Sequence, residues 1–148
     1  MVYHFIYTDG ATPKENAQST VKNMKKAGLD IATTWISADL EYDTWKKNKE
    51  KCTKAKCTKY TKEYLDELKK LGCKKLFIYA NEDYYENYYD KDFIKQYPLW
   101  LACFSKKEPK YKCVMYQYSE TGHVDGINAK VDMNWLYDKS MIAVTADS

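Results

Sequence analysis

Residues 2–28 read VYHFIYTDGATPKENAQSTVKNMKKAG, a short apolar run followed directly by an amphipathic one. The first run is aromatic and β-branched, which predicts a buried strand. The sequence Thr12-Pro13-Lys14-Glu15 then forms a capping box with proline at the first helical position. Apolar side chains recur on one helical face until Gly28, so we expect a helix over about residues 13–27.

The alternation of strand-like and helix-like runs continues along the chain. Residues 29–40 read as a second buried strand. Apolar residues from Cys57 to Leu71 fall at spacings of three and four before Gly72, which predicts a long helix. Strand-like runs follow at KKLFIYA, LWLACF, KCVMYQYS and VDMNWLY, with short helix or irregular loop at 81–97 and loops at 105–112 and 120–130. Six strands and two clear helices predict an α/β fold built from βαβ units.

The composition excludes several classes of protein. Hydrophobic residues make up 45% of the 148-residue chain and aromatic residues 16%, which is enough for a single core and excludes disorder. No run approaches the roughly 18 apolar residues of a membrane span, and the opening MVYHFIYTDG is too short for a secretion signal. All 24 basic residues are lysine, and the absence of arginine argues against specific nucleic-acid binding. Glycine-rich phosphate loops are missing, so no cofactor is implied.

Five cysteines favour an oxidising compartment and raise the question of pairing. Cys103 and Cys113 lie on consecutive predicted strands joined by a short loop, so they are one candidate pair. Cys52 and Cys57 are a second, although a continuous helix through both would strain a disulfide. Cys73 would remain unpaired. The spacing in CTKAKC and the distance of both histidines argue against a zinc site.

Asp39 and Glu41 stand at the carboxyl end of the second predicted strand, where parallel α/β folds place active sites. Residues two apart in a strand share a face. Two crowded carboxylates raise each other's pKa, which suits a general acid near neutral pH. The alternative is a solvated strand end. We expect His4 to be a hydrogen-bonded core residue and His123 to be solvated.

Aromatic residues give a second signal, because several stand in or at the end of predicted strands: Tyr79, Trp100, Tyr116 and Tyr118. Flat rings with a polar edge stack on apolar sugar faces and still offer hydrogen bonds. Core packing is the alternative for each ring. Carboxylates and aromatic rings that converge at one end of a barrel would form a saccharide cleft.

The order of these motifs along nearly the whole chain resembles the glycoside hydrolase family 25 lysozymes. The matching segments are Tyr3-His4-Phe5, Ala38-Asp39-Leu40-Glu41, Ile78-Tyr79-Ala80-Asn81, Leu99-Trp100-Leu101-Ala102, Tyr116-Gln117-Tyr118-Ser119, Gly122 through Gly126 and Val131-Asp132-Met133-Asn134. That family consists of N-acetylmuramidases with an irregular β/α barrel and no metal. The resemblance implies that bacterial peptidoglycan is the partner and substrate.

The resemblance also implies roles for single residues. Glu41 matches the proton donor to the leaving glycosidic oxygen, and Asp39 would orient it or the reacting sugar. Asp132 matches the acidic residue at the cleft floor. The implied substrate-binding residues are Tyr3, Tyr79, Trp100, Gln117 and Tyr118.

The chain departs from the family pattern at its beginning. In the family, the Tyr-His-Phe strand is the third of the barrel and follows a strand with an essential Asp, whereas Tyr3 is the third residue here, and Asp9 is not a substitute. Tyr116 replaces the tryptophan of the W-Q-Y motif. We therefore expect one lysozyme-like catalytic domain over residues 1–148 that lacks the N-terminal strands, as an incomplete or rearranged (β/α) barrel of about six strands. Open edges would favour a homo-oligomer, because barrel closure normally removes them.

Three functions remain open at this stage. The first is a peptidoglycan-cleaving lysozyme, impaired because catalytic groups that act as a unit lose most of their effect when one is missing. The second is a non-catalytic peptidoglycan-binding or interaction module, and the third is a lysine-rich polyanion binder. The expected location is extracellular, with a cytoplasmic phage-type endolysin as the alternative.

Overall fold

The computed structural model describes residues 1–8, 10–46 and 49–141, so Asp9 lies outside the described residues. Its elements in chain order are β1 (Val2–Phe5), α1 (Pro13–Lys26), β2 (Ile36–Asp39), α2 (Tyr42–Lys46), α3 (Lys54–Lys70), β3 (Leu76–Asn81), the π-helix η1 (Tyr84–Tyr88), α4 (Lys91–Ile94), β4 (Leu99–Ala102), β5 (Met115–Gly122), β6 (Val131–Leu136) and the 3₁₀-helix η2 (Lys139–Met141).

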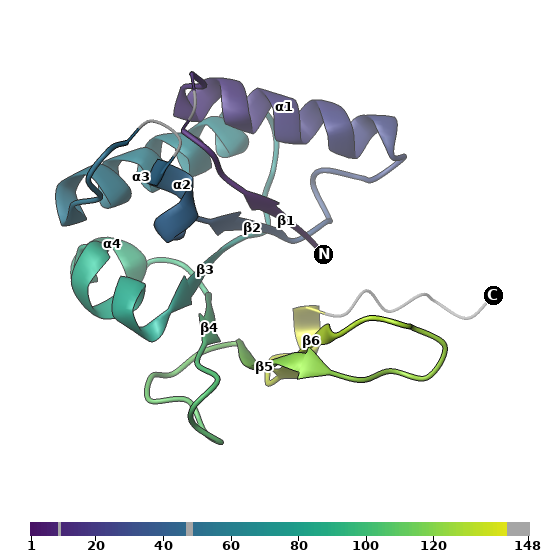
Figure 1. Cartoon of the computed structure of the whole chain (residues 1–148). Coiled ribbons are helices and arrows are strands. Elements are labelled where there is room, and N and C mark those ends of the chain that lie inside the picture. Colours follow the sequence, from purple (N-terminus) through teal and green to yellow (C-terminus); the bar gives the residue numbers. More distant parts are fainter. Residues whose placement is uncertain (9, 47–48, 142–148) are drawn as a thin grey trace.

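The six strands form one sheet in sequence order, β1-β2-β3-β4-β5-β6. Strands β1 to β5 are parallel, and β6 returns antiparallel to β5. Among the described residues, β1 and β6 do not pair with each other, so the sheet is open (Figure 1). The predicted α/β class, with an incomplete barrel of six strands, is confirmed.

One layer of helices packs on one side of the sheet. Helices α1 and α3 lie together over the β1–β3 end (Figure 1). Alternation along β3 turns Leu76, Ile78 and Ala80 toward the main core with these helices, while Phe77 and Tyr79 join a smaller cluster on the opposite face. That opposite face carries the site described below.

Both helices that the sequence predicts are confirmed, with their ends. The Thr12 side chain accepts a hydrogen bond from the Glu15 amide, and the Glu15 carboxylate accepts one from the Thr12 amide, so the capping box is formed. Gly28 (φ +73°) and Gly72 (φ +100°) follow α1 and α3 in left-handed conformations. At the end of each helix, the glycine amide donates to the carbonyl three residues earlier, and the amide of the following residue donates to the carbonyl five residues before it. This pair of hydrogen bonds is a Schellman motif.

Some predicted boundaries are wrong for identifiable reasons. The second strand begins only at Ile36, because the Asp30 carboxylate accepts from the Ala32 amide and starts a turn. Strand β5 continues to Gly122, past the predicted start of the loop at residue 120. The tyrosine-rich segment at 81–97, predicted as short helix or irregular loop, does contain short helices, the π-helix η1 and α4.

The surroundings of the two histidines test their predicted roles. His4 Nδ1 is 2.7 Å from Thr20 Oγ1 and 3.3 Å from Tyr64 OH, and burial lowers its pKa. The hydrogen bonds are as predicted, but His4 is half-buried at the edge of the main core and not within it. The His123 side chain is 77% exposed and lies 3.7 Å from an Asp125 oxygen, which confirms the solvated turn.

The predicted pair of Cys103 and Cys113 is wrong, because β4 and β5 are parallel. Ala102 pairs with Gln117 and Trp100 with Met115, so Cys103 follows the end of β4 whereas Cys113 precedes the start of β5. Five residues of extended chain therefore separate them along the sheet, about 16 Å at 3.3 Å per residue. A disulfide needs Cα atoms within about 7 Å.

Cys52 and Cys57 remain a candidate pair, and we expect them to form a disulfide in an oxidising preparation. Both are thiols in this structure, and their side chains are hydrogen-bonded to each other. Helix α3 has its N-cap at Thr53, so Cys52 lies before the helix and the strain of a continuous helix is absent. Proteolysis after Lys54 and Lys56 should give two peptides joined by the bond. Alkylation of both thiols after the same treatment would contradict the pairing.

Candidate active site

The site begins with a row of side chains that crosses the sheet. Register pairs Phe5 with Asp39, Asp39 with Tyr79, and Tyr79 with Trp100. Because paired residues in neighbouring strands point to the same face, the four side chains line up on the side away from α1 and α3. Asp39 is the last residue of β2 and Glu41 follows two positions later, where the Glu41 amide donates to Thr44 Oγ1 over 2.9 Å.

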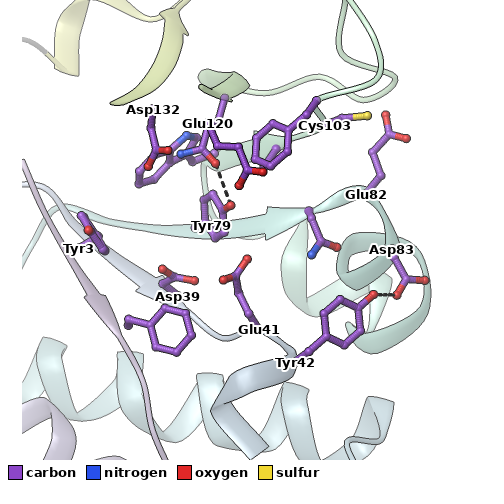
Figure 2. Close-up of a pocket in the computed structure, with 16 residues that line it drawn as sticks. Tyr3, Asp39, Glu41, Tyr42, Tyr79, Glu82, Asp83, Cys103, Glu120 and Asp132 are labelled. Carbon is purple, nitrogen blue, oxygen red and sulfur yellow. Dashed lines mark hydrogen bonds between the residues drawn. The ribbon is translucent and has the colours of Figure 1, made fainter. Parts of the chain in front are cut away.

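These residues line a cavity of about 530 Å³. Seven of the eight predicted site residues are among its lining residues, namely Tyr3, Asp39, Glu41, Tyr79, Trp100, Gln117 and Asp132. In Figure 2 the carboxylates of Asp39 and Glu41 point to the same side, toward Tyr79, while Glu120 and Asp132 enter from the opposite wall. Within the part of the chain that the structure describes, the lining contains no lysine and six acidic side chains: Asp39, Glu41, Glu82, Asp83, Glu120 and Asp132.

Asp39 is the most perturbed acid of the cavity. Its side chain is buried, with 6% of the residue exposed, and Oδ1 has no hydrogen-bond partner among the described residues. Burial, and then the negative charge of Glu41, raise the pKa of Asp39 to about 8. Asp39 therefore carries a proton at neutral pH and can donate it in a hydrogen bond to a ligand oxygen.

Glu41 is half-buried and lies closer to solvent. Burial raises its pKa, and the charges of Asp43, Glu120 and Asp132 raise it further, while the neighbouring Tyr79 hydroxyl lowers it. The net direction is upward. A carboxyl group with a raised pKa beside open cavity space is the arrangement a general acid needs.

The far wall of the cavity is held by side-chain hydrogen bonds. Tyr79 OH donates to Gln117 Oε1 over 2.9 Å, and Trp100 Nε1 donates to Asn134 Oδ1 over 2.9 Å. The Trp100 ring meets Tyr79 edge-on, with centroids 4.8 Å apart. Tyr3, which is 63% exposed, lies edge-on to Trp100 at 6.2 Å and forms the rim beside β1.

Tyr118 is the predicted residue that the structure does not bring to this cavity. It stands one position after Gln117 on β5, so strand alternation turns it to the other face of the sheet. There its ring stacks on Trp135 with centroids 5.5 Å apart. Tyr116, the residue in place of the family tryptophan, is fully buried and donates to the Cys103 carbonyl over 2.9 Å.

Glu120 lines the cavity because of a β-bulge, and the sequence pattern does not single it out. Strict alternation from Gln117 would turn residue 119 inward, but the β5–β6 register shifts between Gln117 and Ser119 and again before Gly122. The shifted strand brings Glu120 to the cavity. The sequence pattern does not single out Tyr42 either. Tyr42 follows Glu41 and lines the cavity. Its hydroxyl donates a hydrogen bond to Asp83, and this bond raises the pKa of Tyr42 to about 12.

Replacing Asp39 by asparagine should stabilise the protein at alkaline pH. The folded pKa of about 8 exceeds the ordinary 3.8, so stability is lost as pH rises between these values and Asp39 ionises without a partner. Asparagine resembles the protonated acid and does not ionise. We expect a gain of roughly 2 to 5 kcal/mol at about pH 9 and little change at about pH 4, since one pKa unit is worth about 1.4 kcal/mol.

Urea unfolding of both proteins at the two pH values measures this effect. Asp125→Asn is the matched control, because Asp125 is fully exposed. Equal gains at both pH values would show that the buried charge of Asp39 is not the cause.

Comparison with known proteins places this arrangement in a family. The family model described as glycosyl hydrolases family 25 matches residues 1–127, which include β1 to β5. The chain belongs to glycosyl hydrolases family 25. Among curated proteins, none matches this member of the family.

Solved structures show the same fold within longer chains. The CTP1L endolysin is 23% identical to this chain, with a TM-score of 0.69. The match covers 94% of this chain and 46% of the endolysin chain. A second relative is the autolysin LytC from Streptococcus pneumoniae in complex with a synthetic peptidoglycan ligand, which is 17% identical with a TM-score of 0.73. That match covers 88% of this chain and 32% of the LytC chain. The spore cortex lytic enzyme SleM from Clostridium perfringens is 17% identical, with a TM-score of 0.72. The match covers 90% of this chain and 48% of the SleM chain. This family 25 chain thus spans less than half of each relative.

Proposed function

We propose that the chain is a peptidoglycan-cleaving lysozyme that hydrolyses the β-1,4 bond between N-acetylmuramic acid and N-acetylglucosamine. One observation carries the proposal: Asp39 and Glu41 share a cavity with the aromatic side chains of Tyr79 and Trp100 on the neighbouring strands. Membership of family 25 supports the reaction class. The relative with a peptidoglycan ligand supports the substrate class.

In this proposal Glu41 gives its proton to the glycosidic oxygen as the bond from that oxygen to the anomeric carbon breaks. Positive charge then develops on the sugar ring, and the carboxyl groups of Asp132 and Glu120 on the opposite wall stabilise it. Water adds to the anomeric carbon, and the Glu41 carboxylate takes a proton from that water, which restores the acid for the next turnover. Asp39, protonated at neutral pH, donates a hydrogen bond that orients Glu41 or the sugar.

The aromatic wall supplies the sugar-binding surface of the proposal. Trp100 and Tyr3 present rings to the cavity, and Tyr79 and Gln117 add a hydroxyl and an amide that are already bonded to each other. Such a pre-formed wall loses little entropy when a sugar packs on it.

The experiment that tests the proposal is an analysis of new chain ends in purified peptidoglycan. Digestion, borohydride reduction and mass spectrometry should yield reduced N-acetylmuramic acid ends. Reduced N-acetylglucosamine ends would contradict the proposed bond.

A non-catalytic peptidoglycan-binding module is the second candidate function. The open sheet favours it, because β1 and β6 leave the described strands short of a closed barrel. Binding to cell walls without any new reducing ends would select this candidate.

The proposed substrate also sets the proposed location, which is outside the cytoplasmic membrane, at the bacterial wall. An endolysin and an autolysin are among the structural relatives, so a phage enzyme made in the cytoplasm remains the alternative. Among the described residues, no helix has the length and apolar content to cross a bilayer.

A further inference from the structure

A second hollow, here called the outer hollow, adjoins the active-site cavity. It has a volume of about 480 Å³ and is lined by Phe104, Ser105, Lys106, Lys107, Tyr118 and Trp135. Phe104 also lines the active-site cavity, so the two share a wall at the end of β4. A ligand that leaves the active-site cavity over Phe104 therefore enters the outer hollow.

The floor of the outer hollow is an aromatic platform. Tyr118 on β5 and Trp135 on β6 stack with centroids 5.5 Å apart and planes 23° from parallel. Trp135 is 56% exposed and Phe104 is 49% exposed. Exposed rings of this size in one place mark a binding surface more often than a structural one. Neither Tyr118 nor Trp135 is used by the proposed reaction.

The charge of the outer hollow is opposite to that of the active-site cavity. Among the described residues, six acidic side chains and no lysine line the active-site cavity, whereas two lysines and no acidic side chain line the outer hollow. Lys106 Nζ is 2.5 Å from Glu82 Oε2, which partly neutralises it. Lys107 has no carboxylate partner among the described residues. A group with negative charge is therefore repelled from one hollow and attracted to the other.

We propose that the outer hollow binds the peptide that peptidoglycan carries on its muramic acid. This inference rests on the proposed function, because it assumes that the glycan lies in the active-site cavity. The glycan is then placed among the aromatic rings and acids, while the attached peptide, which bears free carboxylates and small apolar side chains, extends over Phe104. Lys107 pairs with a peptide carboxylate, and Trp135 with Tyr118 packs against the apolar side chains.

Calorimetric binding of two glycan fragments tests the proposal. One fragment carries its peptides, and the other is the same glycan after an amidase has removed them. Wild-type protein should bind the peptide-bearing fragment more tightly. Lys107→Glu should weaken that binding about fivefold and leave the peptide-free fragment unaffected, as expected for reversal of one exposed charge contact. The difference in affinity between the wild type and Lys107→Glu for the peptide-bearing fragment should shrink at about 0.5 M salt, where exposed charges are screened.

Two further variants separate charge from packing. Lys22→Glu makes the same charge change at an exposed position of α1 that lines neither hollow, and this variant should bind both fragments as the wild type does. Trp135→Ala should weaken the peptide-bearing fragment, and Trp135→Phe should restore part of that affinity. If Trp135→Ala weakens both fragments equally, the platform binds sugar and the peptide assignment is overturned.

The remaining outcomes distinguish the two proposals. Equal affinity of the wild type for both fragments would overturn the outer hollow as a peptide site and leave the proposed function intact. Failure of the wild type to bind either fragment would overturn the proposed function, and the inference would fall with it.

Discussion

Replacing Glu41 by glutamine is expected to lower the rate of peptidoglycan cleavage by about 10² to 10⁴, the usual contribution of a general acid. Glutamine keeps the size of the side chain but has no proton to give to the leaving oxygen. The wild-type rate should also fall as pH rises through the pKa of Glu41, which burial raises above its ordinary value of 4.5. The measurement is the release of reducing ends over a range of pH.

Glu63→Gln is the matched control for this variant, because the Glu63 side chain on α3 is 44% exposed and has only a long contact of 3.9 Å to Lys59. It should cleave at the wild-type rate. Circular dichroism and urea unfolding should show an intact fold for Glu41→Gln. Equal cleavage by Glu41→Gln and the wild type would remove Glu41 from the proposed role.

The second large effect is expected for Trp100→Ala, which should destabilise the fold by about 3–5 kcal/mol. Trp100 is 8% exposed, and its ring centroid lies 4.8 Å from that of Tyr79 and 6.1 Å from that of Phe77. Removing the indole leaves a void in the smaller core cluster and also takes away a sugar-binding surface. Trp100→Phe keeps most of the aromatic surface and loses the hydrogen bond from Nε1 to Asn134. We expect this variant to lower the free energy of unfolding by about 1 kcal/mol.

Urea unfolding measures both variants, with Trp135→Ala as a control. Trp135 is 56% exposed, so its removal should change stability by less than about 1 kcal/mol. The packing account fails if Trp100→Ala is no more destabilising than Trp100→Phe.

The parts of the fold that depend on local chemistry could be predicted from the sequence. Helix α1 is defined by the capping box at Thr12 and by Gly28, and both signals lie within a few residues of the ends they set. The placement of Asp39 and Glu41 at one cavity follows from their position after an apolar run and from strand alternation.

The parts that depend on strand pairing could not be predicted in the same way. Cys103 and Cys113 are close in sequence and on consecutive strands, but the direction of pairing separates them. Glu120 reaches the cavity only because a bulge changes the alternation of β5, and a bulge leaves no clear sequence signal here. Tyr118 illustrates the same limit, since one position decides which face of the sheet a ring occupies.

The central claim is that Glu41 protonates the leaving group, and substrates with different leaving groups test it most directly. A glycoside with a dinitrophenyl leaving group departs without protonation, whereas the natural glycan does not. The account predicts that Glu41→Gln cleaves the dinitrophenyl glycoside at a rate close to that of the wild type and cleaves peptidoglycan about 10² to 10⁴ times more slowly. An equal loss of rate on both substrates would contradict it, because Glu41 would then act on the sugar and not on the leaving oxygen.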